Sequence, residues 1–439
     1  MSSRSNTIRN RLPLAIAAAI VALLVVLVWQ ARVEDHPPSG PQRGPRRTPS
    51  AERGALGHAV EDHPPSGLQR GPRRTPSAER GALGRAVGRN DRPAVPYQRG
   101  MTLGDWGPDA YAPAATRNAL SDLARRGVGS VTLFTVWMQR NERASTIAPG
   151  PSTVRTARLV SAIRIARSLG LDVVLRPFVD LVNHGWRGAV RPRNPTRWWR
   201  DYRRFVLRYA RVAERTGVGM YVIGSEMKSQ SQRSRRWRAL VSEVRHRFRG
   251  AVTYEANWDE FQAVHWWHAL DVIDISGYFP LASGPGSSVQ QLTAAWAGPR
   301  KRLRAAARRF RRPVMLGEVG YTTFAATAVQ PWSRELGGPR DPRAQARAYQ
   351  ATFRAWAGVR WFRGFHWWFV PADPRRVGTT RGYRHIPRAP ALDVLTHRYR
   401  ALASTNVRRP PPALGSDRLA PKTGECPGPA ESSCCSHRC

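Results

Sequence analysis

Two glutamates, Glu226 and Glu318, each end a hydrophobic run and are the strongest candidates for chemistry in this sequence. A carboxyl group at the end of a buried strand loses its hydration, which is costly unless the group is partnered or used. Two such carboxyls facing each other suit cleavage of a glycosidic bond, because one protonates the leaving oxygen while the other attacks the anomeric carbon. Either glutamate alone could instead be a salt-bridge partner in a chain so rich in arginine.

Other polar and aromatic residues follow the remaining hydrophobic runs. Arg176 and Tyr278 could keep a nucleophilic carboxylate ionised by charge and by hydrogen bonding. Tryptophan faces pack well on the C–H surfaces of sugar rings. Glu255 lies within its run and Glu260 beyond it, so both are competitors that are less well aimed. The candidate substrate-binding residues at the ends of the runs are Asp105, Trp137, Arg176, Asn257, Trp258, Tyr278 and Trp367.

The sequence carries no metal-ligand spacing and no phosphate-binding or dinucleotide motif. We therefore expect neither a metal nor a cofactor.

Eight apolar runs alternate with arginine-studded amphipathic stretches between residues 97 and 402. Such alternation predicts a (β/α)8 TIM barrel, whose active site lies at the C-terminal ends of its strands. The expected strands are 99–104, 130–137, 171–178, 219–225, 251–257, 271–277, 313–317 and 363–369. The expected helices are 115–126, 153–169, 196–216, 234–248, 292–310, with an entry turn at Gly298-Pro299, and 341–357.

Three segments outside this domain have a different composition. Residues 34–60 recur as 61–87 with two differences, and both copies are rich in Pro, Gly, Ser and Arg. Two copies of this kind cannot bury a core, so we interpret 31–96 as a disordered linker. Residues 403–439 are interpreted as a disordered tail, which holds all four cysteines.

The N-terminal segment, residues 1–30, predicts export. An apolar run from Leu12 to Trp29 follows three arginines, and it is only slightly shorter than the roughly 20 residues that span a bilayer as a helix. Basic residues before the run place the rest of the chain outside the membrane. We expect a transmembrane signal-anchor with an extracellular catalytic domain at the cell membrane. A cleaved signal peptide, giving a secreted protein, stays open.

The formal net charge of +41 does not predict a nucleic-acid-binding protein. Only three of the 71 basic residues are lysines, and the arginines are scattered along the chain rather than gathered in one patch. A solvated arginine surface accounts for the charge, with attraction to anionic polymers or an anionic envelope as the alternative. We expect no nucleic-acid partner.

Residues 97–402 resemble the clan A glycoside hydrolases, and most of all glycoside hydrolase family 113, whose known members are chiefly β-1,4-mannan-degrading enzymes. The likeness rests on WWRDYRRFVLRYARVAERTGVGMYVIGSEM, YEANWDE, VIDISGYFPL, VMLGEVGY and RAPALDVL. It implies that Glu226 is the acid/base, Glu318 the nucleophile, Tyr278 the partner of the nucleophile and Trp367 the platform under the sugar. It also places Asn257 and Trp258 among the substrate contacts.

Two departures from these relatives concern the substrate. Ser225 stands where most of the clan has Asn, although family 113 also tends to have a small hydroxyl residue at this position. Leu-Arg-Pro-Phe around Arg176 stands where family 113 would have Lys-Pro-His. The resemblance implies a retaining glycosidase on a β-linked polysaccharide or oligosaccharide, with β-mannan first. We expect the protein to be a monomer. A β-glucan, a glycoconjugate or an envelope polysaccharide are alternatives, as is a non-catalytic carbohydrate-binding or scaffold protein.

Overall fold

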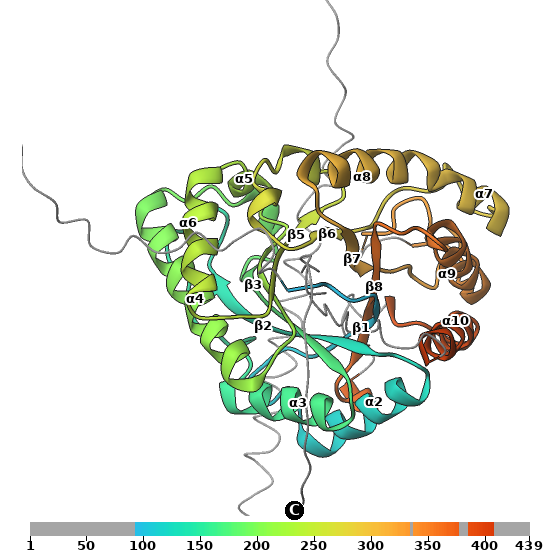
Figure 1. The fold of residues 1–439 in the computed structure, drawn as a ribbon, viewed down its shortest axis with the longest axis horizontal. Helices are drawn as coiled ribbons and strands as arrows, with labels where there is room; N and C mark the ends of the chain where they lie inside the picture. Colours follow the sequence, from blue (N-terminus) through green and yellow to red (C-terminus); the bar gives the residue numbers. More distant parts are fainter. Residues whose placement is uncertain (1–92, 334–336, 377–384, 408–439) are drawn as a thin grey trace, which may run out of the picture. The chain divides into compact units, whose positions relative to one another are not determined.

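The computed structural model describes residues 93–333, 337–376 and 385–407, and these form a closed parallel barrel with helices around it (Figure 1). Neighbouring strands pair in chain order, and β1 closes the barrel by pairing with β8. This confirms the predicted (β/α)8 fold, and every expected strand overlaps an observed one. The strands are β1 (Gln98–Gly104), β2 (Ser130–Gln139), β3 (Asp172–Leu181), β4 (Met220–Ser225), β5 (Ala251–Asn257), β6 (Ile273–Ser276), β7 (Val314–Val319) and β8 (Phe362–Pro371).

The helices pack on the outer face of the barrel, and the main apolar core lies between the two layers. α4 is the longest, with the Asn194 side chain capping its first turn and Gly217 ending it in the left-handed conformation. The helices are α2 (Pro113–Arg125), α3 (Thr156–Ser168), α4 (Pro195–Thr216), α5 (Lys228–Ser231), α6 (Ser234–Arg245), α7 (Val289–Ala295), α8 (Ala297–Phe310), α9 (Pro342–Trp356) and α10 (Ala389–Val407).

The stretch predicted as one helix over 292–310 is two helices. α7 begins after Ser288, whose side chain forms a capping box with Gln291, and the break comes at Trp296 rather than at Gly298-Pro299. Pro299 instead lies in the first turn of α8, where its missing N–H has no intrahelical partner to lose.

A histidine fills part of the barrel interior. His366 on β8 is fully buried, and its Nδ1 lies 2.8 Å from Thr132 Oγ1 while its Nε2 lies 3.3 Å from Gln98 Oε1. Burial lowers the pKa of His366 to about 3, so the ring is neutral near pH 7. A Cβ on Gly100 would come within 2.5 Å of this ring, so the glycine makes room for it.

The predicted anchor (1–30), nearly all of the linker (31–96) and most of the tail (403–439) lie outside the described residues. Among the residues that are described, no helix is long and apolar enough to cross a membrane. α10 continues to Val407, beyond the boundary that we placed at residue 402.

Gly364 lies where β8 closely approaches β1, so a substitution there tests how these two strands pair. Its φ is +98°, and an added Cβ would lie 2.0 Å from the carbonyl oxygen of Gln98 on β1. We expect Gly364→Ala to lower the free energy of unfolding by about 2–5 kcal/mol, because overpacking adds to the cost of a positive φ. The measurement is urea unfolding of the full chain.

The matched control is Gly170→Ala, where φ is +75° and no atom lies within 4 Å of the new Cβ. Only the backbone cost of about 1–2 kcal/mol applies there. Equal losses in the two variants would contradict the close approach of β1 and β8.

Candidate active site

A cleft of about 560 Å³ opens at the C-terminal ends of the strands. It brings together most of the side chains that the sequence singled out, although they come from five different strands and the loops after them. The predicted residues that line it are Arg176, Glu226, Asn257, Trp258, Tyr278 and Glu318.

Glu318, on β7, is held on both carboxylate oxygens. Its Oε2 lies 2.7 Å from Nη1 of Arg176, and its Oε1 accepts a hydrogen bond of 2.7 Å from the hydroxyl of Tyr278. The contact with the guanidinium is charge-assisted, which makes it stronger than a hydrogen bond between neutral groups. The side chain of Glu318 is 15% exposed, so it is reachable from the cleft. This is the arrangement that a nucleophilic carboxylate requires.

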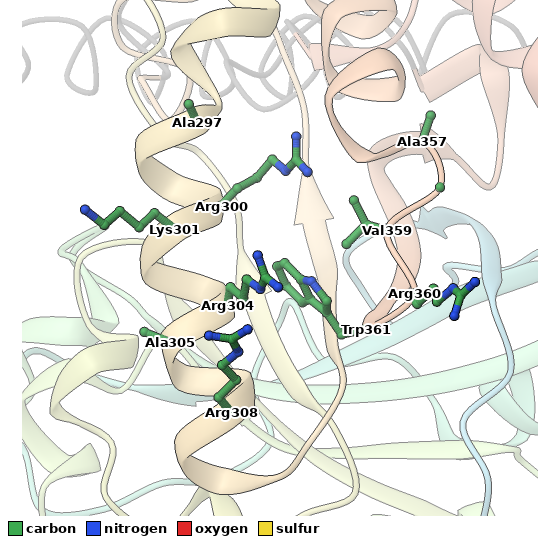
Figure 2. A pocket seen from close by; sticks show the side chains of 11 residues that line it. Ala297, Arg300, Lys301, Arg304, Ala305, Arg308, Ala357, Val359, Arg360 and Trp361 are labelled. Carbon is green, nitrogen blue, oxygen red and sulfur yellow. The ribbon is translucent and has the colours of Figure 1, made fainter.

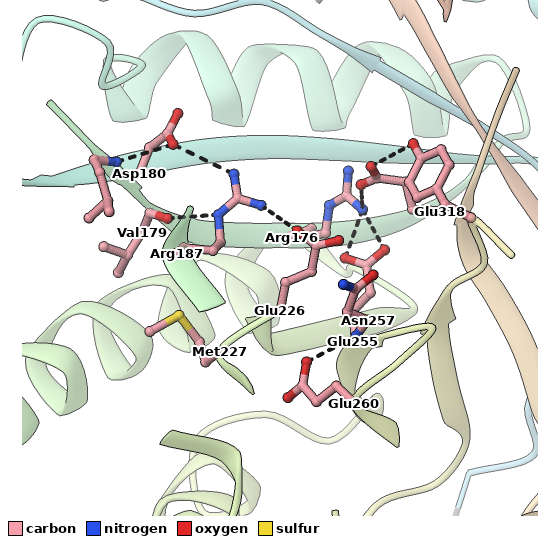
Figure 3. Close-up of polar contacts among 12 residues, drawn as sticks. Arg176, Val179, Asp180, Arg187, Glu226, Met227, Glu255, Asn257, Glu260 and Glu318 are labelled. Carbon is pink, nitrogen blue, oxygen red and sulfur yellow. Dashed lines mark hydrogen bonds and ion pairs between the residues drawn. The ribbon is translucent and has the colours of Figure 1, made fainter. Parts of the chain in front are cut away.

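Arg176 connects Glu318 to a second carboxyl group deeper in the barrel (Figure 3). The same Nη1 donates to Oε1 and Oε2 of Glu255 on β5, at 2.6 and 2.8 Å. Both side chains are buried, with 2% exposure for Arg176 and none for Glu255. Glu255, which the sequence suggested only as a competitor, is therefore a buried partner of the cation that holds Glu318.

The barrel interior holds more acids than bases. Desolvation raises the pKa of Glu255 to about 7 in spite of Arg176, and it raises the pKa of Asp274 on β6 well above its usual value. A raised pKa favours the protonated form of a buried carboxyl, which reduces the repulsion among the clustered acids.

Glu226 directly follows β4 and has a left-handed backbone, with φ of +54°. Its N–H donates to the carbonyl oxygen of Glu255 at 2.8 Å, which holds this turn against the next strand. A left-handed conformation costs a non-glycine residue roughly 1–2 kcal/mol, and such strain gathers where function needs a particular side-chain direction. The turn directs the Glu226 carboxyl into the cleft.

Arg187 is a functional candidate that the sequence did not reveal. It lies in the short 3-10 helix Arg187–Ala189 after β3, and its Nη1 donates to Oε2 of Glu226 at 3.0 Å. Nε donates to the carbonyl oxygen of Val179 at 3.0 Å, and Nη2 lies 3.6 Å from Asp180. The guanidinium also lies 4.5 Å from the ring centre of Phe178. Four contacts thus fix one cation beside Glu226.

Opposing influences act on the pKa of Glu226. Burial raises it, Arg187 lowers it and the negative charge of Glu318 raises it again, with a net rise above the usual value. Glu318 and Glu226 therefore have different surroundings: one carboxyl is held by an arginine and a tyrosine, and the other is poised to carry a proton. Such a difference separates a nucleophile from an acid/base.

The prediction that Trp367 forms the platform under the sugar is wrong. Trp367 is fully buried on the outer face of β8, where its ring stacks on Tyr349 of α9 with 3.9 Å between centres. Successive side chains of a strand point to opposite faces, so the neighbouring Trp368 faces inward. Trp368 lines the cleft, and its ring centre lies 5.3 Å from the guanidinium of Arg176.

Two further predicted residues lie away from the cleft lining. Trp137 on β2 is buried against α4, where its Nε1 donates to the hydroxyl of Tyr209 at 3.3 Å and its ring packs on Phe205. Asp105, just after β1, is buried, and the adjacent Trp106 lines the cleft instead. The prediction for Trp137 is wrong because its side chain points to the outer face of β2, toward α4.

Exposed aromatic side chains stand at the rim of the cleft. Trp258 stacks on Trp332, with 5.2 Å between ring centres, and Trp332 is 42% exposed. Trp186 lines another part of the cleft and is 43% exposed. The sequence analysis missed Trp186 and Trp332, although an aromatic residue in a Gly-rich loop such as His-Gly-Trp-Arg-Gly could have signalled the first.

Asn257 and Asp259 add polar groups near Trp258. Nδ2 of Asn257 donates to Asp259 at 3.0 Å, and Lys228 forms an ion pair with the same aspartate at 2.6 Å. No group of three or more potential metal ligands occurs within the part of the chain that the structure describes.

Removing the central cation should be strongly destabilising. We expect Arg176→Met to lower the free energy of unfolding at pH 8 by about 3–5 kcal/mol, because it leaves buried carboxyls without their partner. The loss should be smaller at pH 5. Without Arg176 the folded-state pKa of Glu255 rises further above the ordinary value of 4.5, so its protonated form is tolerated at low pH and the penalty grows as the pH rises.

Urea unfolding at the two pH values measures this difference. The control is Arg203→Met, which breaks an exposed ion pair with Glu243 and should cost less than about 1 kcal/mol. A loss for Arg176→Met that did not depend on pH would contradict the electrostatic account.

Comparison with known proteins agrees with this geometry. The family model described as Glycoside Hydrolase Family 113 matches residues 101–377. The solved structure of the β-mannanase AaManA from Alicyclobacillus acidocaldarius, in complex with ManMIm, is 29% identical, with a TM-score of 0.62, and the match covers 70% of this chain and 98% of that one. A GH113 β-1,4-mannanase solved as a complex is 26% identical, with the same TM-score and with 70% and 99% covered. No curated protein matches the chain.

The family match covers more than half of the chain and includes both cleft glutamates together with the strands that carry them. The cleft, its two differently held carboxyls and this match lead to one conclusion: the chain belongs to glycoside hydrolase family 113 and is a glycoside hydrolase.

Proposed function

We propose that this glycoside hydrolase cleaves β-1,4-linked mannan with retention of anomeric configuration. The observation that carries the proposal is the different environment of the two cleft carboxyls. Arg176 and Tyr278 hold the two carboxylate oxygens of Glu318, whereas burial raises the pKa of Glu226. On this ground we propose Glu318 as the nucleophile and Glu226 as the acid/base.

The reaction has two steps. In the first, the Glu318 carboxylate attacks the anomeric carbon while protonated Glu226 gives its proton to the glycosidic oxygen, so the C–O bond breaks and a glycosyl ester forms. In the second, ionised Glu226 takes a proton from water, the water oxygen attacks the same carbon, and Glu318 leaves as a carboxylate. Tyr278 and Arg176 stabilise that carboxylate as it departs.

Two observations support mannan as the substrate. The two solved relatives compared above are described as β-mannanases. Ser225, which lines the cleft directly before Glu226, leaves more room near the acid/base than the Asn that is common in the clan. That room suits the different direction of the 2-hydroxyl in mannose. Trp368, Trp258 and Trp332 offer aromatic surface for successive sugars.

Substitution of each carboxyl tests the mechanism on β-1,4-mannan. We expect Glu226→Gln and Glu318→Ala to lose about 10²–10⁴-fold or more of the rate of sugar release, because each removes one chemical role. Azide should rescue Glu318→Ala and give a glycosyl azide of inverted configuration. NMR of the first product of the parent enzyme should show retention.

The matched control is Glu243→Gln, which removes the same charge from the outer surface of α6 and should leave the rate unchanged. If the parent protein binds mannan but releases no sugar, and all three variants bind equally well, the enzyme proposal fails. A non-catalytic carbohydrate-binding protein then takes its place.

The pH profile tests the role of Arg187. Its cation favours ionised Glu226, so Arg187→Gln should raise the pKa of Glu226 and move the alkaline limb of kcat/KM to higher pH by about one unit. The other charged groups that interact with Glu226, namely Glu318, Arg176, Glu255 and Glu260, are unchanged in this variant.

The comparison variant is Arg211→Gln, an exposed arginine on α4 outside the cleft, whose profile should match that of the parent. An alkaline limb that stays in place or moves to lower pH in Arg187→Gln would show that Arg187 does not tune the acid/base.

A further inference from the structure

A second large hollow lies on the outer wall of the barrel, away from the cleft. It has a volume of about 890 Å³ and lies between α8 and the segment 357–361, which joins α9 to β8 (Figure 2). It shares no lining residue with the catalytic cleft. We call it the arginine groove and define it by Arg300, Lys301, Arg304, Arg308, Arg360 and Trp361.

The charged residues that line the groove are all positive. Five of its lining residues are cationic and none is acidic. Both walls come from long stretches without any Asp or Glu, namely residues 275–317 and 342–372. Elsewhere on the surface many arginines have carboxylate partners, such as Arg155 with Asp109 and Arg203 with Glu243. Within the described part of the chain, none of the five groove cations forms an ion pair.

The stability of α8 does not explain this arrangement. Arg300, Arg304 and Arg308 follow each other at i, i+4 spacing, where like charges repel. Arg300 and Lys301 also lie near the N-terminal end of α8, where the helix dipole disfavours cations. An anion in the groove would relieve both effects. The Nε atom of Arg300 is consistent with such a ligand, since it is buried without a hydrogen-bond partner among the described residues.

The shape of the groove fits a chain with repeated negative charges. A helix rises about 1.5 Å per residue, so the three arginines are spaced by about 6 Å along the axis of α8. Guanidinium groups bind carboxylates and phosphates by paired hydrogen bonds. Figure 2 shows Arg300 and Arg304 extending toward the side where the half-buried Trp361 lies. An indole beside cations offers a surface on which a sugar ring can pack.

We propose that the arginine groove binds an anionic polysaccharide, with its carboxylate or phosphate groups on Arg300, Arg304 and Arg308 and a sugar ring on Trp361. The choice of a polysaccharide over another polyanion rests on the proposed function, because a glycan-degrading enzyme works within polysaccharide mixtures. The groove would hold the enzyme on a charged polymer and leave the catalytic cleft free for a neutral one.

The test compares two triple variants of the full chain. One is Arg300→Gln, Arg304→Gln and Arg308→Gln together. The control is Arg117→Gln, Arg164→Gln and Arg211→Gln, which removes the same charge from exposed positions on α2, α3 and α4. Binding to polygalacturonate is measured by titration at several salt concentrations, and sugar release is measured on neutral β-1,4-mannan.

We expect the groove variant to lose about tenfold or more in affinity for polygalacturonate, with a smaller salt dependence, while the control changes little. Both should hydrolyse neutral mannan like the parent. Trp361→Ala should weaken binding to polygalacturonate but not to inorganic polyphosphate, which has no ring to pack. Circular dichroism establishes that each variant is folded.

Equal losses in the two triple variants would overturn the proposal, since they would show a diffuse effect of surface charge. Tighter, groove-dependent binding of single-stranded DNA than of polygalacturonate would also overturn it and would make nucleic acid the occupant. Failure of the proposed function is a separate result: no sugar would be released from any neutral glycan, whereas groove-dependent binding would persist.

Discussion

The contacts of Arg176 allow several carboxyl groups to lie close together at the centre of the barrel. One nitrogen of this buried guanidinium touches carboxyl groups from β5 and β7, so three strands meet through a single charge. A buried cation of this kind is tolerated only where anions surround it, and the surrounding acids are tolerated only because of the cation. Glu318 remains partly exposed in this set, and Arg176 and Tyr278 hold its two carboxylate oxygens.

The backbone supplies the second constraint, because it directs a carboxyl from β4 into the same cleft. Glu226 has a left-handed backbone and is met there by Arg187, which arrives from the loop after β3. The loop and the turn are separate segments of the chain. Arg187 is also fixed by the carbonyl oxygen of Val179 and by Asp180. Glu226 is thus positioned by two elements, the turn after β4 and the loop after β3, and the turn is also hydrogen-bonded to the backbone of Glu255.

The fold could be predicted from the sequence because buried strands of a parallel barrel are nearly continuous apolar runs, and each run is bounded by an arginine-rich helix. The two glutamates could be predicted because a carboxyl ending such a run is conspicuous. The same continuity hides which side of the barrel a residue faces. Phe-His-Trp-Trp-Phe on β8 has no alternation of polar and apolar residues, so Trp367 and Trp368 could not be told apart. Arg187 begins a three-residue 3-10 helix in the loop after β3, and nothing in the local sequence distinguishes it from the other basic residues, which number 71 with it.

The left-handed backbone at Glu226 also bears on how this protein could change over time. Glycine or asparagine would adopt that conformation with less strain, and either would remove the acid/base. At this position, the residue that would best stabilise the fold differs from the residue that the proposed catalysis needs. A small residue at this turn would make the barrel more stable, and it would also end the chemistry that we propose for Glu226. The proposed activity and the stability of the fold thus place opposite demands on one backbone position.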